Sequence, residues 1–159
     1  MFYIWAVVYR LYIPEDFARL YAVEEACFQP PFRFARGYMR QLVNDSDAAT
    51  WIVEEDGRME GFAIVQWGRE KSEFIAYLMT IEVMPETRGR RVGAELLARS
   101  EESARAAGAA RIWLHVDEEN AGAIRLYRKW GYVFEGRHEN YYPRGRAALI
   151  GVKALGYPF

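Results

Sequence analysis

The sequence predicts a mixed α/β domain whose strands and helices follow the order β-α-α-β-β-β-α-β-α-β-β. Three observations support this fold class. Apolar residues with strand spacing and apolar residues with helix spacing occupy separate stretches of the chain. Asp56-Gly57 joins two strand-like runs, which is a strong hairpin signal. A third apolar strand passes through the basic turn TRGRRVG into a helix. We therefore expect a sheet with helices on both sides.

The first half of the chain contains one strand and two helices. Residues 2–12 alternate aromatic and β-branched residues, as a strand does, and Pro14 ends that strand. The apolar positions Phe17, Leu20, Val23 and Cys27 follow a helical period, and Gln29-Pro30-Pro31 ends this helix. We expect a shorter helix over residues 34–44.

The second half begins with the hairpin in residues 50–67 and a third strand over 73–84. The helix after the basic turn has one apolar stripe, formed by Val92, Leu96, Leu97, Ser100, Ala104 and Ala107. We expect Glu95-Arg99 and Glu101-Arg105 to be i,i+4 ion pairs on its solvent face, with Gly108 as its C-cap. A buried strand, RIWLHV, a helix from Asn120 to Gly131 and strands over 132–135 and 147–155 complete the fold.

Composition limits the possible functions. The chain has 159 residues, 52% of them hydrophobic, which suits a single domain over 1–159 with a substantial core. Its 21 basic and 22 acidic residues nearly cancel, which argues against general nucleic-acid binding. One cysteine and two histidines exclude an internal disulfide and offer no ligand set for a structural zinc, so no metal is expected. With no apolar run long enough to span a membrane and no targeting signal, we expect a cytoplasmic protein.

The turn between the third strand and its helix is the candidate ligand site. Free N–H groups at a helix start, together with the positive end of the helix dipole, form an anion cradle. Arg88, Arg90 and Arg91 add positive charge, and Gly89 and Gly93 permit close backbone approach. A nucleotide-like diphosphate fits this pattern, although neither a Walker A loop nor GxGxxG is present. The alternative is a solvated basic turn with no ligand.

Two joined motifs resemble the GCN5-related N-acetyltransferase (GNAT) superfamily. The stretch VMPETRGRRVGAELL, from Val83 to Leu97, is similar to the superfamily's acetyl-CoA loop, V-x-P-x-x-R-G-x-G-x-G-x-x-L-L. The stretch LHVDEENAGAIRLYRKWGY, from Leu114 to Tyr132, resembles its strand, N-x-x-A helix and G-Y ending. The resemblance covers essentially the whole chain and implies the acyl-CoA N-acyltransferase fold, with a mixed, mostly antiparallel sheet. Arg91 departs from the pattern because it stands where the superfamily usually has glycine.

The resemblance implies acetyl-CoA as co-substrate and assigns residues to it. Backbone groups of Ile81 and Val83, left free by a splayed strand, would pair with the pantetheine arm. The helix beginning at Asn120 would line the cofactor, with Asn120 also a candidate N-cap. The residues expected to take the pyrophosphate are Arg88, Gly89, Arg90, Arg91, Val92, Gly93 and Ala94, and those expected on the helix are Asn120 and Ala123, or its neighbour Ile124.

Within the superfamily the chain looks most like N-terminal α-amine acetyltransferases: the ribosomal-protein alanine N-acetyltransferases and the NatE-type catalytic subunit. EEACFQPPF and RHENYYPRG are similar to their substrate-binding segments. The resemblance therefore implies that Phe28, Pro30 and Tyr142, with Tyr141 beside them, surround the first side chain of a peptide substrate. The alternative for this group is an aromatic core patch.

Three residues are the candidate catalytic groups. By resemblance, Tyr77 and His115 hold a water that takes the proton of the amine, and Tyr127 donates to the leaving sulfur. Histidine suits this task because deprotonating an α-amine at pH 7 costs about 1 kcal/mol, against about 4.6 kcal/mol for lysine. Without the motif, His115 would be read as a half-buried strand histidine and Tyr127 as a core tyrosine beside Trp130 or Tyr132.

The resemblance leaves three functions open. The first is acetylation of a protein or peptide N-terminus by direct attack of the amine on the thioester. The second is acetylation of a small amine such as a polyamine, an amino acid or a drug, for which Glu24, Glu25 and Glu82 could form an acidic pocket. The third is a non-catalytic acyl-CoA-binding subunit, favoured if a Cβ at Arg91 strains the phosphate loop.

Overall fold

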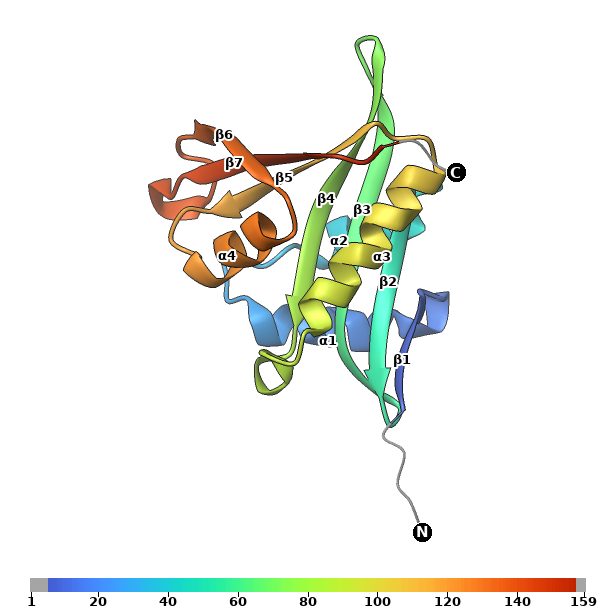
Figure 1. Ribbon diagram of the computed structural model, residues 1–159. Helices are drawn as coiled ribbons and strands as arrows, with labels where there is room; N and C mark the ends of the chain where they lie inside the picture. Colours follow the sequence, from blue (N-terminus) through green and yellow to red (C-terminus); the bar gives the residue numbers. More distant parts are fainter. Residues whose placement is uncertain (1–5, 157–159) are drawn as a thin grey trace. The chain divides into compact units, whose positions relative to one another are not determined.

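A computed structural model describes residues 6–156. The chain divides into two compact units, Met1–Ile64 with Thr80–Ser100 and Val65–Met79 with Glu101–Phe159. The units share two strands and a helix, because β3 (Arg58–Glu70), β4 (Glu73–Val83) and α3 (Val92–Ala106) each run from one unit into the other (Figure 1). Among the described residues, none of the helices has the length and apolar content needed to cross a membrane.

The described residues place seven strands in one sheet with the order β1-β2-β3-β4-β5-β7-β6. β4 and β5 (Arg111–Asp117) pair in parallel, whereas β1 with β2, β5 with β7 and β6 with β7 pair antiparallel. The parallel pair requires a crossover connection, which α3 supplies. This confirms the predicted mixed, mostly antiparallel sheet with flanking helices.

The first unit confirms the predicted order of its elements. It contains β1 (Val7–Leu11), α1 (Phe17–Cys27), α2 (Arg36–Asn44) and β2 (Ala48–Glu55), followed by the start of β3. The predicted first strand began at Phe2, and its residues 2–5 lie outside the described part of the chain. The turn at Asp56-Gly57 has φ angles of 53° and 78°, as a tight hairpin with two left-handed residues requires.

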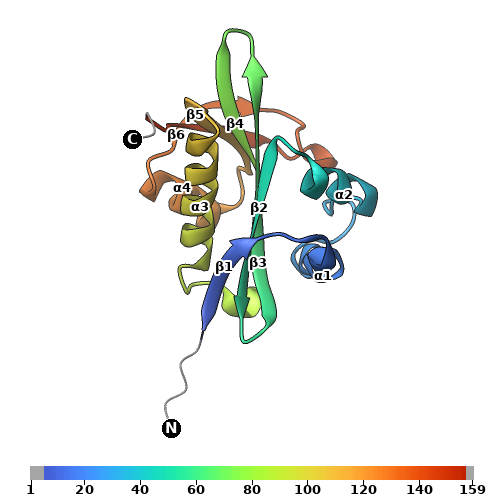
Figure 2. The same ribbon diagram turned by 90° about the vertical axis from the view of Figure 1, so that its right-hand side faces the viewer.

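Helices cover both faces of the sheet in the first unit. Figure 2 shows α3 on one face of β2 and β3 and α1 and α2 on the other. The apolar stripe of α3 meets the sheet through Val92 and Leu96, which pack on Val53 and Ala63. The start of α3 is therefore anchored at the point where the basic turn ends.

Gly61 allows β3 to lie close to the last residues of β4. A Cβ at this position would stand 2.5 Å from the carbonyl oxygen of Glu82 and 3.2 Å from the Cα of Val83. Real Cβ atoms do not approach a backbone oxygen so closely, so only glycine fits without a shift of one strand. Gly61 thereby sets the position of Glu82 and Val83, which lead into the basic turn.

The second unit is built around β5 and β7 (Ala148–Ala154), which pair along the whole length of β5. β6 (Val133–His138) lies on the other side of β7, and α4 (Ala121–Lys129) connects β5 to β6. The hairpin between β3 and β4 supplies residues 65–79. The strands and the helix predicted for this region are confirmed, with β6 extended to His138.

Glu101 differs from the prediction. It was expected to pair with Arg105 on the solvent face of α3, but it is only 7% exposed. Its carboxylate accepts hydrogen bonds of 2.8 Å from the Tyr132 hydroxyl and 2.8 Å from Lys153 Nζ. Arg105 pairs instead with Glu102, at 2.7 Å, whereas the predicted Glu95–Arg99 pair is present at 2.9 Å. Partners from distant strands therefore outweigh the local i,i+4 spacing.

Glu101→Ala is expected to lower the free energy of unfolding by about 1–3 kcal/mol, because it leaves the buried Tyr132 hydroxyl and the Lys153 ammonium without their acceptor. Urea unfolding measures the change. Glu102→Ala is the matched control, since the Glu102 side chain is 72% exposed and its loss should change stability by less than about 0.5 kcal/mol. Equal effects of the two substitutions would contradict the role of Glu101.

Candidate active site

The turn between β4 and α3 has the backbone geometry of an anion cradle. After the short helix Pro85–Thr87, Gly89 has a φ of 86° and Arg91 a φ of 62°, and Val92 begins α3. The first helical hydrogen bond runs from Glu95 N to Arg91 O, at 3.2 Å, so the N–H groups before Glu95 are those that a helix start leaves without helical partners. Arg91 thus adopts the left-handed conformation that glycine takes most easily.

Two of the three arginines in this turn are bonded to the protein. Arg88 Nε donates to Val83 O at 3.1 Å, and Arg88 Nη2 lies 3.7 Å from Cys27 Sγ. Arg90 Nη2 pairs with Glu55 Oε1 at 2.9 Å. Arg91 is exposed, and its side chain makes neither a hydrogen bond nor an ion pair with the residues that the structure describes. Of the three arginine side chains in this turn, that of Arg91 is therefore the one without a hydrogen-bonding or charged partner among the described residues.

The end of β4 partly corrects the expectation for the pantetheine arm. Pairing of β4 with β5 covers Ala76–Leu78 and Ile112–Leu114 and does not continue toward Val83. The Val83 carbonyl was nevertheless expected to be free, and it is not. It accepts from Arg88 Nε and also lies 3.5 Å from Cys27 Sγ. The role of Ile81 and Val83 toward the pantetheine arm stays a prediction.

In the second unit, Tyr77 and His115 form one hydrogen-bonded pair. Tyr77 lies opposite Trp113 in the β4–β5 register, and His115 follows two residues later on the same face of β5. The Tyr77 hydroxyl bonds His115 Nδ1 directly, and the ring centroids are 5.5 Å apart. The structure therefore brings together the two groups that were expected to hold a water, and the water itself stays a prediction.

Tyr141, in the connection between β6 and β7, contacts both members of this pair. Its ring stacks on the His115 imidazole with a centroid distance of 4.2 Å and an interplanar angle of 3°. Its hydroxyl lies 3.3 Å from the Tyr77 hydroxyl. Burial, and then the charge of His138, lower the pKa of His115, so its imidazole is neutral at pH 7 and can accept a proton.

Helix α4 carries Asn120, Ala123 and Tyr127. Asn120 is the N-cap, because its side-chain oxygen accepts from Ala123 N at 3.1 Å, as predicted. Tyr127 is buried with its ring edge-on to Tyr132, at 5.5 Å and 62°. Burial raises the pKa of Tyr127 to about 12. The cofactor roles of Asn120 and Ala123 stay predictions.

The residues predicted to surround the first substrate side chain lie in both units. Phe28 is the C-cap of α1 and 37% exposed, and Pro30 follows it; both belong to the first unit. Tyr141 and Tyr142 belong to the second unit and contact each other edge-to-face at 4.9 Å. The structure therefore brings Tyr141 and Tyr142 together with the Tyr77–His115 pair. Phe28 and Pro30 remain together at the end of α1.

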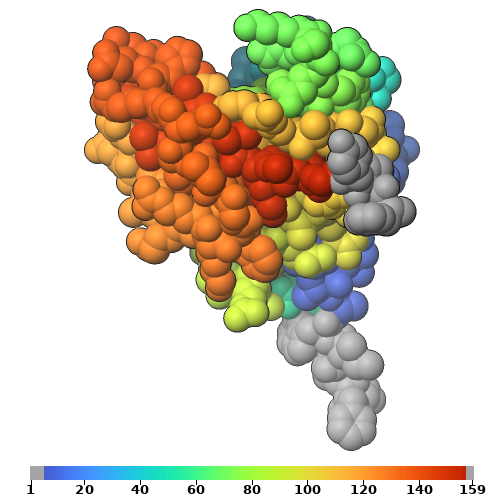
Figure 3. Space-filling model, turned by 45° about the horizontal axis from the view of Figure 1, so that its top comes forward, coloured from blue at the N-terminus to red at the C-terminus, as the bar shows by residue number. Residues whose placement is uncertain are grey.

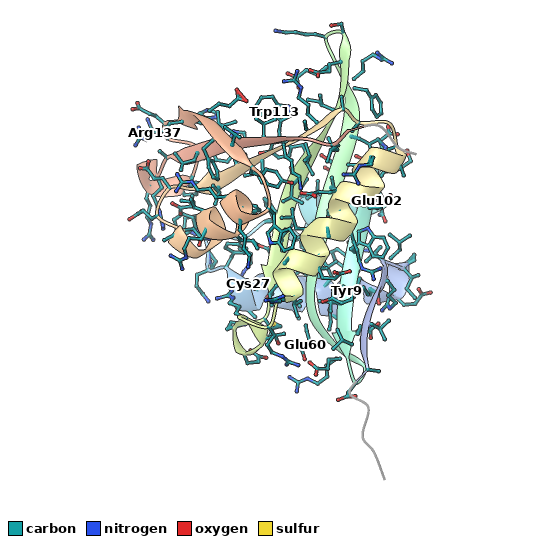
Figure 4. The ribbon with its side chains drawn as sticks, in the orientation of Figure 1. Tyr9, Cys27, Glu60, Glu102, Trp113 and Arg137 are labelled. Atoms are coloured by element: carbon teal, nitrogen blue, oxygen red, sulfur yellow. The ribbon has the colours of Figure 1, made fainter. Side chains whose placement is uncertain are left out.

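A groove of about 590 Å³ in the second unit opens beside the Tyr77–His115 pair. In Figure 3 the β3–β4 hairpin (green) and the β6–β7 region (orange to red) stand on two sides of a hollow. Trp113 projects from β5 beneath the hairpin (Figure 4). It was not among the predicted site residues. The available signal was its position two residues before His115, which places both side chains on the same face of β5. The groove is lined by Glu70, Lys71, Ser72, Glu73, Ile75, Tyr77, Trp113, His115 and Ile150.

Comparison with known proteins places these features in context. A family model described as "Acetyltransferase (GNAT) family" matches residues 5–132. Streptothricin acetyltransferase of Streptomyces lavendulae is 37% identical over 93 residues, which are 58% of this chain and 48%, or about half, of that protein. A Bacillus subtilis (strain 168) protein, named as a candidate ribosomal protein bS18-alanine N-acetyltransferase, is 28% identical over 137 residues, 86% of this chain and 87% of that one. The crystal structure of the ribosomal-protein-S18-alanine N-acetyltransferase from Escherichia coli superposes with a TM-score of 0.83 at 24% identity and covers 97% of both chains.

Proposed function

Because this chain belongs to the acetyltransferase (GNAT) family and is an acetyl-CoA-dependent N-acetyltransferase, we propose that its acceptor is the N-terminal α-amine of a protein or peptide. The observation that carries this proposal is the Tyr77–His115 pair under Tyr141. A neutral imidazole is a weak base. It can deprotonate an α-amine with a pKa of about 7.7–8.0 but is poorly matched to a lysine amine at about 10.4.

The proposed reaction moves one acetyl group and one proton. The neutral amine attacks the thioester carbonyl, the new C–N bond forms, the C–S bond breaks, and the thiolate leaves. The amine proton passes to the Tyr77 hydroxyl as that hydroxyl gives its own proton to His115 Nδ1. The direct Tyr77–His115 hydrogen bond supports this relay, in which His115 acts through Tyr77.

Tyr127 would stabilise the leaving thiolate by donating a hydrogen bond. Complete proton transfer from a phenol with a pKa of about 12 to a thiol at about 8.5 is uphill by about 5 kcal/mol. A hydrogen bond to the forming thiolate needs no such transfer and still lowers the barrier. Burial of Tyr127 therefore favours the hydrogen-bonding role over full protonation.

The remaining residues would hold the co-substrate. The turn from Arg88 to Ala94 would bind the pyrophosphate. Arg91 would supply a positive charge to it, since no described residue forms an ion pair with the Arg91 side chain. Ile81 and Val83 would pair with the pantetheine arm once Arg88 leaves the Val83 carbonyl, and Asn120 and Ala123 would line the cofactor from α4. Arg88 would thus exchange a backbone carbonyl for a phosphate oxygen on binding.

Arg91→Gly is expected to raise the free energy of unfolding by about 0.5–1 kcal/mol, because glycine adopts a φ of 62° without steric cost. Arg91→Ala is the matched control: it removes the same charge but keeps the Cβ, so it should bring no gain. Urea unfolding measures stability, and calorimetry measures CoA affinity, which should fall by up to about fivefold in Arg91→Ala. A stabilising Arg91→Ala would contradict the assignment of strain to this residue.

The groove beside His115 supports an acceptor larger than a simple amine. Its volume of about 590 Å³ lies within the usual range for ligand sites, about 300–1,000 Å³. From Tyr77 to Glu73, at the hairpin end, β4 extends over about 13 Å at the rise of a strand. The residues after an acetylated N-terminus would lie along this groove, on Ile75, Trp113 and Ile150.

A small-molecule amine is the second candidate, favoured by the similarity to streptothricin acetyltransferase. The carboxyls expected to attract a polycation are less available than the sequence suggested. Glu24 and Glu82 are buried, and burial, followed by the proximity of the Glu24 carboxyl, raises the pKa of Glu82 well above its usual value. Burial thus disfavours the charged form of Glu82, which weakens the attraction of this site for a polycation. Glu25 lies 3.9 Å from Arg33.

Acetyl transfer to a panel of amines, followed by mass spectrometry, tests the proposal. The panel contains peptides with free Met, Ala or Ser N-termini, an N-blocked peptide with an internal lysine, and spermidine. We expect acetylation of free N-termini only. Acetylation of spermidine alone would replace the proposal by the small-amine function. CoA binding with no turnover on any acceptor would replace it by a non-catalytic role.

A further inference from the structure

The two histidines of the chain lie side by side in the second unit. The ring centroids of His115 and His138 are 5.6 Å apart, with an interplanar angle of 55°. His138 also contacts Tyr141, at 5.0 Å and 54°. Tyr141 in turn stacks on His115. Tyr141 and the two imidazoles therefore form one three-ring cluster beside the Tyr77 hydroxyl.

Sheet register explains why residues 23 positions apart in the sequence meet. His115 in β5 lies opposite Ile150 of β7, and His138 in β6 lies opposite Ala148 of the same strand. Residues 148 and 150 point to one face of β7, so their partners on both sides point to that face too. The irregularity between Phe134 and Gly136 in β6 sets this register.

We propose that His138 is a positioning residue for His115: it holds Tyr141 against the imidazole of His115, and a proton on His138 disfavours a second proton on His115. The inference rests on the proposed function in one respect, namely that His115 is the base. His138 itself touches neither the Tyr77 hydroxyl nor the proposed path of the proton, so its effect passes through His115 and Tyr141.

The other charged groups around His115 are engaged with other partners or lie at the rim of the groove. Glu73 pairs with Arg111 at 2.9 Å, and on the strand of His138 itself Arg137 pairs with Glu118 at 2.7 Å and with Glu139 at 2.9 Å. Opposite the two histidines, β7 presents only the apolar residues Ala148 and Ile150. Facing His115 are Glu70, Lys71 and Glu73 from the hairpin, Tyr77 from β4, and His138 and Tyr141.

The expected size of the coupling follows from the distance. Two unit charges 5.6 Å apart in a water-like medium disfavour each other by on the order of half a pKa unit, and by more where water is partly excluded. His138 is exposed, so the lower figure applies. This repulsion acts in the same direction as the lowered pKa of His115, for which burial is the larger cause and the charge of His138 the smaller one.

Titration of the two imidazoles by NMR tests the proposal on the full chain without requiring activity. Two histidines give two sets of ring signals, and His115→Ala identifies which set belongs to His138. His138→Gln removes the charge and keeps a polar side chain, whereas His138→Lys keeps a positive charge at every pH of the titration. We expect the His115 midpoint to lie about half a unit higher in His138→Gln than in His138→Lys.

The pH profile of kcat/KM provides the second readout. The acidic limb should move to higher pH in His138→Gln relative to His138→Lys, by the same amount as the NMR midpoint. A purely structural role would lower the rate in both variants without moving the limb. Equal His115 midpoints in the two variants would overturn the proposal. A displaced midpoint in a protein that acetylates no N-terminus would support the coupling and count against the proposed function alone.

Discussion

Tyr127→Phe is expected to lower kcat for acetyl transfer by about 100-fold while CoA affinity stays nearly unchanged. The substitution removes one hydroxyl from a buried ring that packs on Tyr132, so the fold loses little. What it removes is the hydrogen bond offered to the leaving thiolate, and losing one such donor to a developing anion typically costs about 10²–10³-fold in kcat. The loss should fall on kcat because the interaction exists only in the transition state.

The measurement combines steady-state kinetics with calorimetry of CoA binding. Tyr38→Phe is the matched control, since Tyr38 is 43% exposed on α2 in the first unit and its hydroxyl has no assigned role. It should leave kcat within about twofold, as surface changes usually do. An unchanged kcat in Tyr127→Phe would remove Tyr127 from the mechanism, and a large loss of CoA affinity would turn it into a binding residue.

His115→Ala is expected to lower kcat by about 100-fold and to flatten the acidic limb of the pH profile. Burial and the neighbouring His138 lower the pKa of His115 below its ordinary value of 6.5. The neutral base is thus fully present above 6.5 and is lost as the pH falls through the lowered pKa. The midpoint of the acidic limb in the unmodified protein should therefore lie below 6.5.

Tyr77→Phe separates the two members of the pair. It removes the hydroxyl that bonds His115 Nδ1 but keeps the imidazole, so kcat should fall while an acidic limb remains. Rates from about pH 5 to 9 on the best peptide of the panel provide the comparison. If the acidic limb survives in His115→Ala, another group is the base; if Tyr77→Phe keeps full activity, the proton does not pass through Tyr77.

Local sequence signals were sufficient for most elements of the fold. Asp56-Gly57 predicted a hairpin because few residue pairs tolerate two left-handed φ angles, and the structure has both. The apolar stripe of α3 predicted its buried face because helical periodicity depends on neighbours three and four residues away. Such signals are contained within one element, so they can be read without knowing the rest of the fold.

Side-chain partners across the sheet could not be predicted in this way. Glu101 was assigned to the solvent face because Arg105 stands four residues later, yet its partners Tyr132 and Lys153 are 31 and 52 residues away. Two hydrogen bonds to a buried carboxylate outweigh an exposed i,i+4 pair, which contributes only about 0.3–0.5 kcal/mol. Only the register of the strands determines which distant residues reach α3.

The sequence by itself contained the basic turn before α3 and the two motifs whose resemblance to the family makes His115, Tyr127 and Tyr77 candidates, because such motifs can be recognised in the order of residues along the chain. Tertiary structure alone decided that Arg88 occupies the Val83 carbonyl, that Tyr77 bonds His115 directly, and that Tyr141 and His138 gather on that histidine. The physical reason is register: β7 aligns β5 with β6, and residues that are remote in sequence then share one face.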